Sequence, residues 1–206
     1  NPGYSCGWGF SALIGDDTLF DTGEKTDTLA ANLELSGVDC AQIRRVVISH
    51  ADWDHVGGIG VLSKVGAIDV FVPAPCDPKL ASDLAAVNPR LNVIAVDAGR
   101  EIASGLFLTG AQGEPKREIG LVADTGHGML LVSGCAHPGL SDMIVAASAF
   151  GAVKMVFGGF HGFEEYDALA DMDLIIPSHC TQHKDEIKMR YPKKTRFVKA
   201  GDSFDL

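Results

Sequence analysis

Five of the seven histidines follow apolar, strand-like segments, and two aspartates accompany the first pair. In open α/β sheets, ligands bind at the carboxyl ends of strands, so side chains in these positions can converge. Neutral imidazole and carboxylate groups are common ligands of transition-metal ions. The pattern therefore predicts a metal site. The seven candidate ligands are His50, Asp52, Asp54, His55, His137, His161 and His179.

The segment His50-Ala-Asp-Trp-Asp-His55 is the most specific part of this pattern, because four ligand-type side chains fall within six residues. It follows Arg45-Val-Val-Ile-Ser49, an apolar and β-branched run that predicts a buried strand. A Gly-Gly pair comes after it and permits close approach of the backbone. The alternative is a polar turn in which Asp52 or Asp54 caps a helix, but that interpretation requires neither histidine.

The segment Ser49-His-Ala-Asp-Trp-Asp-His-Val-Gly-Gly58 resembles the signature of the metallo-β-lactamase superfamily, His-x-His-x-Asp-His followed by Gly-Gly. Asp52 stands where the second histidine of that signature usually lies. Four further segments agree with the superfamily in their order: Phe20-Asp-Thr-Gly23, Gly134-Cys-Ala-His-Pro-Gly139, Gly158-Gly-Phe-His161 and Ser178-His-Cys-Thr181. The last three of these segments are similar to those of metal-dependent hydrolases in the branch that includes archaeal dihydropterin-ribofuranosylaminobenzene-phosphate synthases.

The resemblance implies a dinuclear metal centre in which Asp54 has the catalytic role, because it would bind metal and orient the nucleophile. His161 falls where many relatives carry a bridging carboxylate, so it would bind one ion only or contact substrate. Whether Asp52 bridges the ions is left open. The first metal site would consist of His50, Asp52 and His137, and the second of Asp54, His55 and His179.

A bound metal ion lowers the pKa of water from about 15.7 to roughly 7 and so generates hydroxide near neutral pH. The resemblance therefore implies a metal-dependent hydrolase that acts on a small ester-like or phosphoester substrate. Zinc suits the mixed His and Asp ligands, while the oxygen ligand Asp52 keeps iron and manganese as alternatives. A pterin-pathway-type synthase, a di-iron redox protein and a non-catalytic metal-binding module are the competing functions.

The order of expected elements predicts an α/β protein. A hairpin, helices and strands occupy the first part of the chain, and a similar series follows in the second part. There, Glu101–Gly110 and Ile119–Ser133 are expected as adjacent strands, and the closing segment Gly201-Asp-Ser-Phe-Asp is compatible with the final strand of the family that the chain resembles. The resemblance implies a four-layer αβ/βα sandwich of two mixed sheets packed face to face with helices outside, formed by one domain over residues 1–206. The expected helices are Thr26–Leu35, Gly57–Gly66, Pro78–Val87, Ser141–Phe150 and Glu164–Met172.

Composition excludes some partners. The net charge is −10 and no basic stripe is present, so nucleic acid is not expected as a partner. The mixed-charge segment Lys184–Arg196 predicts a solvated helix and turn. No apolar run reaches about 18 residues, so no membrane span is expected. A small-molecule substrate is expected, and the oligomeric state is not indicated.

Five widely spaced cysteines, an odd number, favour reduced thiols in a cytoplasmic protein over a disulfide framework. Cys135 and Cys180 are interpreted as packed core thiols. Trp53 is expected either to line the substrate site or to pack under its loop. His127 and His183 are interpreted as surface residues.

Overall fold

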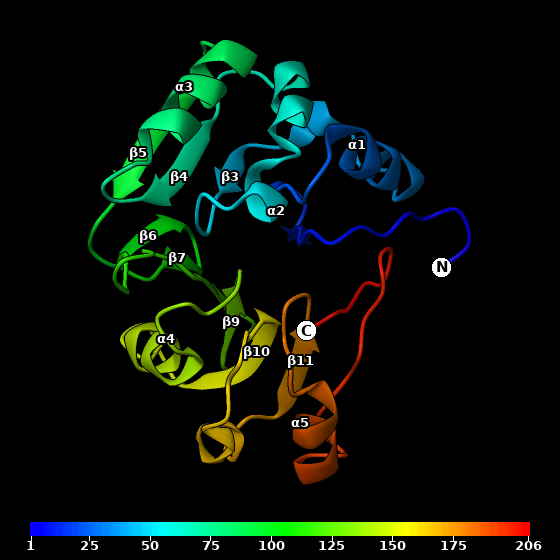
Figure 1. The fold of residues 1–206 in the computed structure, drawn as a ribbon, viewed down its shortest axis with the longest axis vertical. Coiled ribbons are helices and arrows are strands. Elements are labelled where there is room, and N and C mark those ends of the chain that lie inside the picture. Colours follow the sequence, from blue (N-terminus) through cyan, green and yellow to red (C-terminus); the bar gives the residue numbers. More distant parts are fainter. The chain divides into compact units, whose positions relative to one another are not determined.

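A computed structural model describes residues 1–206. The chain divides into two compact units, each built on its own β-sheet (Figure 1). The first unit comprises residues 1–97 and 199–203, and the second comprises residues 98–198 and 204–206. The interpretation of residues 1–206 as one domain stays a prediction.

The sheet of the first unit is mixed and has the strand order β1-β2-β3-β4-β5. The first two strands form the predicted antiparallel hairpin, whose turn contains Gly15 with a positive φ of 60°. The remaining strands run parallel to β2, so their carboxyl ends lie along one edge of the sheet. The strands are β1 (Ala12–Ile14), β2 (Thr18–Phe20), β3 (Arg45–Val47), β4 (Asp69–Pro73) and β5 (Asn92–Val96).

Helices pack on this sheet through leucines at helical spacing. Leu29 and Leu33 of α1, and Leu80 and Leu84 of α3, share one buried apolar cluster with Val70 of β4. Burial of each such side chain contributes about 1.5–3 kcal/mol of transfer free energy. The helices are α1 (Thr26–Leu35), α2 (Trp53–Val56) and α3 (Pro78–Val87), with 3₁₀ turns η1 (Cys40–Gln42) and η2 (Ile59–Lys64).

The sheet of the second unit is also mixed, with the order β11-β10-β9-β8-β7-β6. Strands β9, β10 and β11 are parallel, and β6 to β9 form an antiparallel meander. The strands are β6 (Arg100–Ala103), β7 (Leu106–Leu108), β8 (Leu121–Asp124), β9 (Met129–Ser133), β10 (Val153–Gly159) and β11 (Leu174–Ser178).

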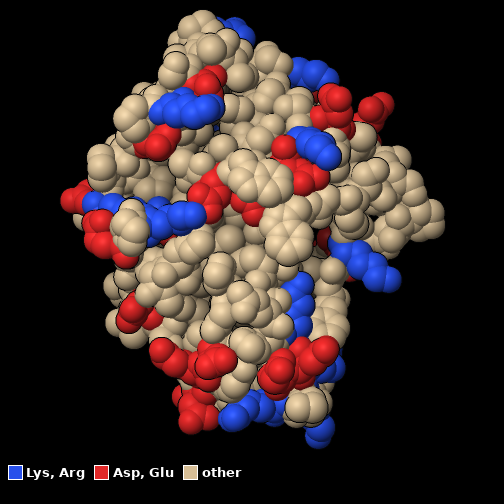
Figure 2. Space-filling view, in the orientation of Figure 1, with Lys and Arg blue, Asp and Glu red and all other residues tan.

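The helices of the second unit bury Leu140 and Met143 of α4, Leu169 of η3 and Ile187 of α5 in one cluster with the sheet. None of the helices in the chain has the length and apolar character needed to cross a membrane. Lys and Arg side chains lie among Asp and Glu side chains on the face shown in Figure 2. The helical elements are α4 (Leu140–Ala147), η3 (Tyr166–Leu169) and α5 (Lys184–Arg190).

Several predicted boundaries were wrong for local reasons. The α-helix expected over Gly57–Gly66 does not form, because α2 ends at Val56 and the segment after the two glycines is the 3₁₀ turn η2. Helix α4 begins directly after Gly139, whose positive φ of 106° turns the chain, so Ser141 is not the cap. Helix α1 keeps its predicted bounds, although its N-cap is Lys25 without a side-chain hydrogen bond.

The predicted strand segments at 101–110 and 119–133 were too coarse, because each contains two strands joined by a turn. The turns contain Gly105 and Gly126, whose φ angles of 72° and 77° explain the reversals. The expected final strand near the C-terminus does not form. Only an isolated bridge joins Thr195 to Ile175 of β11.

Candidate metal centre

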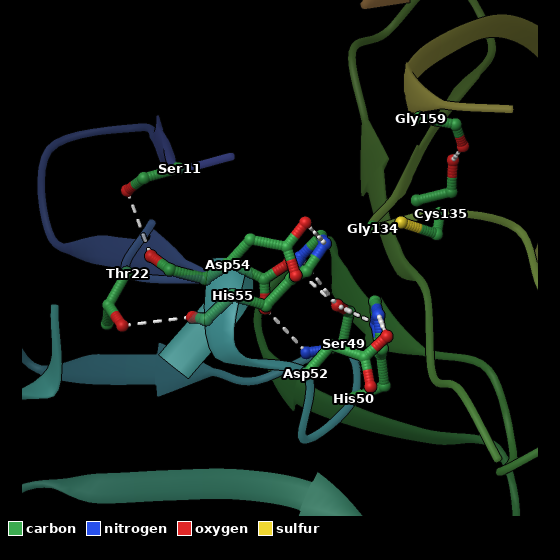
Figure 3. A network of polar contacts seen from close by, with 12 residues as sticks. Ser11, Thr22, Ser49, His50, Asp52, Asp54, His55, Gly134, Cys135 and Gly159 are labelled. Atoms are coloured by element: carbon green, nitrogen blue, oxygen red, sulfur yellow. Dashed lines mark hydrogen bonds and ion pairs between the residues drawn. The ribbon is translucent and has the colours of Figure 1, made fainter. Parts of the chain in front are cut away.

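The first unit brings its four predicted ligands together where β3 ends. The chain leaves β3, passes through His50 and enters α2, which carries Asp54 and His55. The rings of His50 and His55 have centroids 4.1 Å apart. Asp52 Oδ2 lies 3.4 Å from His50 Nε2, and Asp54 Oδ2 lies 3.9 Å from His55 Nε2. Each imidazole Nε2 therefore has a carboxylate oxygen beside it (Figure 3).

Asp52 does not cap a helix with its side chain, which was the alternative to its being a metal ligand. It occupies the N-cap position of α2, but its side chain accepts no capping hydrogen bond from that helix. Its carboxylate is half-exposed and lies towards His50. Asp54, in contrast, is buried, and its backbone carbonyl accepts a hydrogen bond of 3.2 Å from the N–H of Phe10. The cluster thus combines an accessible and a buried carboxylate.

A buried hydrogen-bond chain sets the tautomers of both histidines. His55 Nδ1 lies 2.7 Å from Asp21 Oδ2, and a carboxylate can only accept, so Nδ1 carries the proton. Ser49 Oγ donates to the same oxygen over 2.7 Å, so it accepts from His50 Nδ1 at 2.9 Å. In neutral rings the lone pairs are therefore on the two Nε2 atoms. Histidine ligands of metals are oriented by carboxylate partners in this way.

Asp21 is the residue that sequence reasoning did not place in the site. It follows β2, has a positive φ of 54°, and is fully buried. Besides the two contacts above, its Oδ1 accepts the backbone N–H of Ser49 over 2.7 Å. Its only sequence signal was the Asp-Thr-Gly segment, which gave no role to either Asp21 or Ser49.

The segment after Asp21 also fixes α2. Thr22 donates its backbone N–H and its hydroxyl to the carbonyl of His55, over 2.8 and 2.9 Å. Gly58 donates its N–H to the carbonyl of Gly23. A Cβ atom on Gly58 would lie 1.9 Å from the carbonyl oxygen of Thr22. The Gly-Gly pair therefore serves close backbone approach, as predicted.

We expect Gly58→Ala to lower the free energy of unfolding by about 1–3 kcal/mol or more, because the added methyl group overlaps a backbone carbonyl. The matched control is Gly66→Ala, since a Cβ there meets nothing within 4 Å. That change should be neutral or stabilising by up to about 1 kcal/mol. Urea denaturation followed by circular dichroism measures both, and equal stability of the two variants would contradict the close approach.

In the second unit, a buried carboxylate holds the loop that carries His137. Glu118 is fully buried, and its Oε1 accepts the backbone N–H groups of Gly134, Cys135 and Ala136 over 2.9–3.1 Å. Its Oε2 accepts the N–H of His137 over 3.0 Å. Four consecutive amides thus enclose one carboxylate, as in backbone anion nests. Glu118 was not predicted as part of the site, because it lies 19 residues before the histidine that it positions.

The other two histidines follow neighbouring parallel strands. His161 comes after β10 and His179 after β11, and both have a positive φ of 44°. The ring centroids of His137 and His161 are 5.2 Å apart, so these two predicted ligands come together. Thr181 ties the loops, because its Oγ1 accepts the N–H of Phe160 and donates to the carbonyl of Ser178.

Backbone strain marks the same segments in both units. The non-glycine residues with positive φ are Asp21, Ala136, His161 and His179. Such conformations cost free energy and gather at functional sites, where the surrounding structure enforces them. All four lie in the segments that carry the candidate ligands or their hydrogen-bond partners. This distribution supports a functional role for both clusters.

The other cysteine, tryptophan and histidine side chains lie only partly where the sequence predicted. Cys180 is only half-buried, and its Sγ lies 3.2 Å from that of Cys135, so its interpretation as a core thiol was wrong. Trp53 is 62% exposed and does not pack under its loop. His127 is exposed as predicted, whereas His183 is half-buried and lies 3.3 Å from Glu164 Oε1.

The donor set suits divalent metal ions. The first unit offers two imidazole Nε2 atoms with carboxylates beside them, and the second offers further imidazoles after its parallel strands. Zinc takes such nitrogen and oxygen ligands, and iron and manganese take them as well. Both clusters could therefore hold metal. The division of the seven ligands between two ions, with His50, Asp52 and His137 on one, stays a prediction.

Comparison with known proteins identifies the family. The family model described as "Metallo-beta-lactamase superfamily" matches residues 10–179, which is most of the chain. The chain belongs to the metallo-β-lactamase superfamily. Members of this superfamily use divalent metal ions, and most of them are metal-dependent hydrolases. The predicted resemblance is confirmed.

A curated relative of this chain is 7,8-dihydropterin-6-methyl-4-(β-D-ribofuranosyl)-aminobenzene-5′-phosphate synthase of Methanocaldococcus jannaschii. The two are 24% identical over 192 residues, and the match covers 69% of this chain and 64% of the relative. The chain therefore spans somewhat less than two thirds of that relative's length. This is the branch that the later sequence segments predicted.

Solved structures show the same fold. Tm1679, described as a metal-dependent hydrolase of the β-lactamase superfamily, has a TM-score of 0.82 and 22% identity, covering 100% of this chain and 94% of its own. YhfI of Bacillus subtilis has a TM-score of 0.66 and 14% identity, covering 93% and 88%. The predicted fold class, two mixed β-sheets with helices in the metallo-β-lactamase fold, is confirmed.

Proposed function

We propose that this chain is a metal-dependent hydrolase whose dinuclear centre acts on a small ester-like or phosphoester substrate. In this proposal, His50, Asp52 and His137 bind one ion, and Asp54, His55 and His179 bind the other. Zinc is the proposed metal, and the cytoplasm is the proposed compartment. His161 binds one ion or contacts the substrate.

The observation that carries the proposal is the hydrogen-bond chain from His50 through Ser49 and Asp21 to His55. This chain keeps the proton of each ring on Nδ1. Each Nε2 therefore has a lone pair, on the side where Asp52 and Asp54 lie. A purely structural pair of histidines would not need two carboxylates beside the lone pairs. Two lone pairs beside two carboxylates are electrostatically costly without a cation between them.

The residues of the chain have separate roles in this proposal. Bound divalent ions would supply Lewis-acid chemistry, since they acidify water and polarise the carbonyl or phosphoryl oxygen of a substrate. Asp54 is buried and held by α2, so its carboxylate can orient the attacking water and accept its proton. Asp52 is half-exposed, and its negative charge would offset the positive charge of the metal ions at the accessible side of the site. Trp53 is exposed beside them and can contact substrate.

A synthase reaction of the pterin-pathway type is the second candidate. It is favoured by the match to the archaeal synthase, at 24% identity. The same ions would then activate a phosphorylated substrate. The two candidates share every metal ligand, and only substrate trials separate them.

The first test is the metal content of protein purified without chelators or added metal. We expect about two equivalents of zinc per chain, falling towards one in Asp52→Ala and kept in Asp52→His, because imidazole replaces the carboxylate at that position. Asp16→Ala is the matched control, since Asp16 is an exposed aspartate of the β1–β2 turn. Elemental analysis by mass spectrometry measures all four proteins.

Other metal contents would favour a different function or contradict the proposal. Two equivalents of iron would favour redox chemistry or an iron-dependent hydrolase. One equivalent or none, unchanged by either Asp52 substitution, would show that the two-metal assignment is wrong. If metal is bound, Asp54→Asn should reduce turnover of chromogenic phosphoesters or lactones by about 100-fold or more, as expected for loss of a proton acceptor.

A further inference from the structure

Two thiols of the second unit lie unusually close together. Cys135 is in the loop after β9, and Cys180 follows the histidine after β11. Their sulfur atoms are 3.2 Å apart, with Cys180 Sγ donating to Cys135 Sγ. Strand β10 lies between β9 and β11 in the sheet, so the two loops meet over its end. The predicted metal ligands alone do not account for this pair of thiols.

The end of β10 is shaped to allow the approach of the thiols. A Cβ atom on Gly159 would lie 2.7 Å from Cys180 Sγ, 3.2 Å from Cys135 Cα and 2.2 Å from the carbonyl oxygen of Gly134. Any side chain at this position would therefore separate the sulfurs. Ser133 Oγ donates to the carbonyl of Gly159 over 2.9 Å and fixes the strand end there.

His179 completes a third donor position. One ligand atom from each of Cys135, His179 and Cys180 can be chosen so that all lie within 4.8 Å of one another. The backbone of His179 is fixed, because Lys184 Nζ donates to its carbonyl over 3.1 Å. Two sulfurs and one imidazole, with a fourth position open, form a known type of zinc-binding set. Thiolates also select soft ions such as Cu⁺.

We propose that Cys135, Cys180 and His179 form a binding site for one thiophilic metal ion, such as Cd²⁺, Zn²⁺ or Cu⁺. With metal–sulfur bonds of about 2.3 Å, two sulfurs on a tetrahedral ion lie about 3.8 Å apart. The pair therefore has to open by roughly half an ångström, which a side-chain rotation achieves. As each sulfur–metal bond forms, one S–H bond breaks and its proton passes to the buffer, so no electron is transferred.

The binding itself does not depend on the proposed function, because all three donors belong to one unit. A consequence does rest on that function, since His179 is also assigned to the dinuclear centre. A thiophilic ion that takes His179 would compete with the second ion of that centre. The site would then make the enzyme sensitive to soft metals.

The test uses Cd²⁺ as the probe, added to the whole chain under a phosphine reductant. Cadmium–thiolate bonds give an ultraviolet charge-transfer band that oxygen and nitrogen ligands do not give. We expect this band at one equivalent of Cd²⁺ in the wild type, roughly half of it in Cys135→Ser or Cys180→Ser, and none in the double variant. Cys76→Ser is the control, because burial and Asp77 raise the pKa of the Cys76 thiol and disfavour its thiolate.

Three further measurements make the result decisive. Circular dichroism verifies folding, and Cys135→Ala with Cys180→Ala provides a second pair of variants if serine is not tolerated. His179→Asn should weaken cadmium binding by about 10-fold or more while retaining the band, as loss of one ligand implies. Asp52→Ala should lower the metal content of the dinuclear centre and leave the band unchanged, so failure of that centre is distinguishable. An undiminished band in the double variant, or no band in the wild type, would overturn the proposal.

Discussion

Glu118→Ala is expected to lower the free energy of unfolding by about 4 kcal/mol or more, because four buried backbone N–H groups lose their acceptor. Each orphaned group costs about 1–3 kcal/mol. The carboxylate is fully buried and accepts from residues 134–137 over 2.9–3.1 Å. Urea denaturation followed by circular dichroism measures the loss.

The matched control is Glu114→Ala in the loop just before Glu118. Its side chain is 81% exposed and reaches Arg117 Nε only at 3.9 Å. Exposed ion pairs contribute at most about 1 kcal/mol. If both variants were equally stable, the enclosed carboxylate would have no structural role, and the loop of His137 would be held by other contacts.

Glu118→Gln separates charge from shape. The amide keeps one oxygen, which can still accept from three of the amides, but its NH₂ group would face the N–H of His137. Two donors then oppose each other at this residue. We expect a smaller loss of stability than in Glu118→Ala, together with weaker metal binding, because the backbone of His137 is displaced. Equal metal content in Glu118→Gln and wild type would show that His137 does not depend on this contact.

Much of the fold could be predicted because its signals are local. The bounds of α1 and α3 follow from periodicity and from Pro78 at the start of α3. The β-branched run before His50 predicted β3. The errors lie where backbone geometry decides. Gly139 turns the chain with a positive φ, so α4 begins at Leu140, and α2 is a single turn inside the motif.

The candidate ligands could also be predicted, because His and Asp at strand ends are visible in the sequence. Their supporting residues could not. Asp21 and His55 are 34 residues apart, and Glu118 and His137 are 19 apart, yet each pair is in direct contact. From the sequence alone, an acidic residue that becomes buried cannot be distinguished from an exposed one. Only the fold shows which of the 27 acidic residues accept hydrogen bonds from the ligand segments.

The closeness of Cys180 to Cys135 was missed for a related reason. Alternation along a strand predicts that Cys180 points away from its neighbour His179. However, β11 ends at Ser178, and His179 has a positive φ, so strand alternation no longer applies. The turn after the strand brings both side chains towards the same loop. Rules for strands therefore fail at the residues where chemistry is concentrated.

Asp21→Asn is expected to reduce metal affinity at the cluster of the first unit by about 10–100-fold, the usual effect of losing a partner that orients a ligand. The asparagine NH₂ group is a donor, whereas the carboxylate oxygen that it replaces accepts from His55 Nδ1. His55 can restore the hydrogen bond only if Nδ1 becomes the acceptor. Its proton then moves to Nε2, which removes the lone pair that would bind metal.

The tautomer gives this prediction a readout beyond metal content. Nitrogen-15 NMR of the metal-stripped protein should show His55 protonated at Nδ1 in the wild type and at Nε2 in Asp21→Asn. Asp27→Asn is the control, because Asp27 is an exposed residue of the first turn of α1. Asp21→Ala should also weaken metal binding but leave the tautomer mixed, since no partner fixes it. If Asp21→Asn bound metal as tightly as the wild type with an unchanged tautomer, the hydrogen-bond chain would not be what prepares His55 for metal.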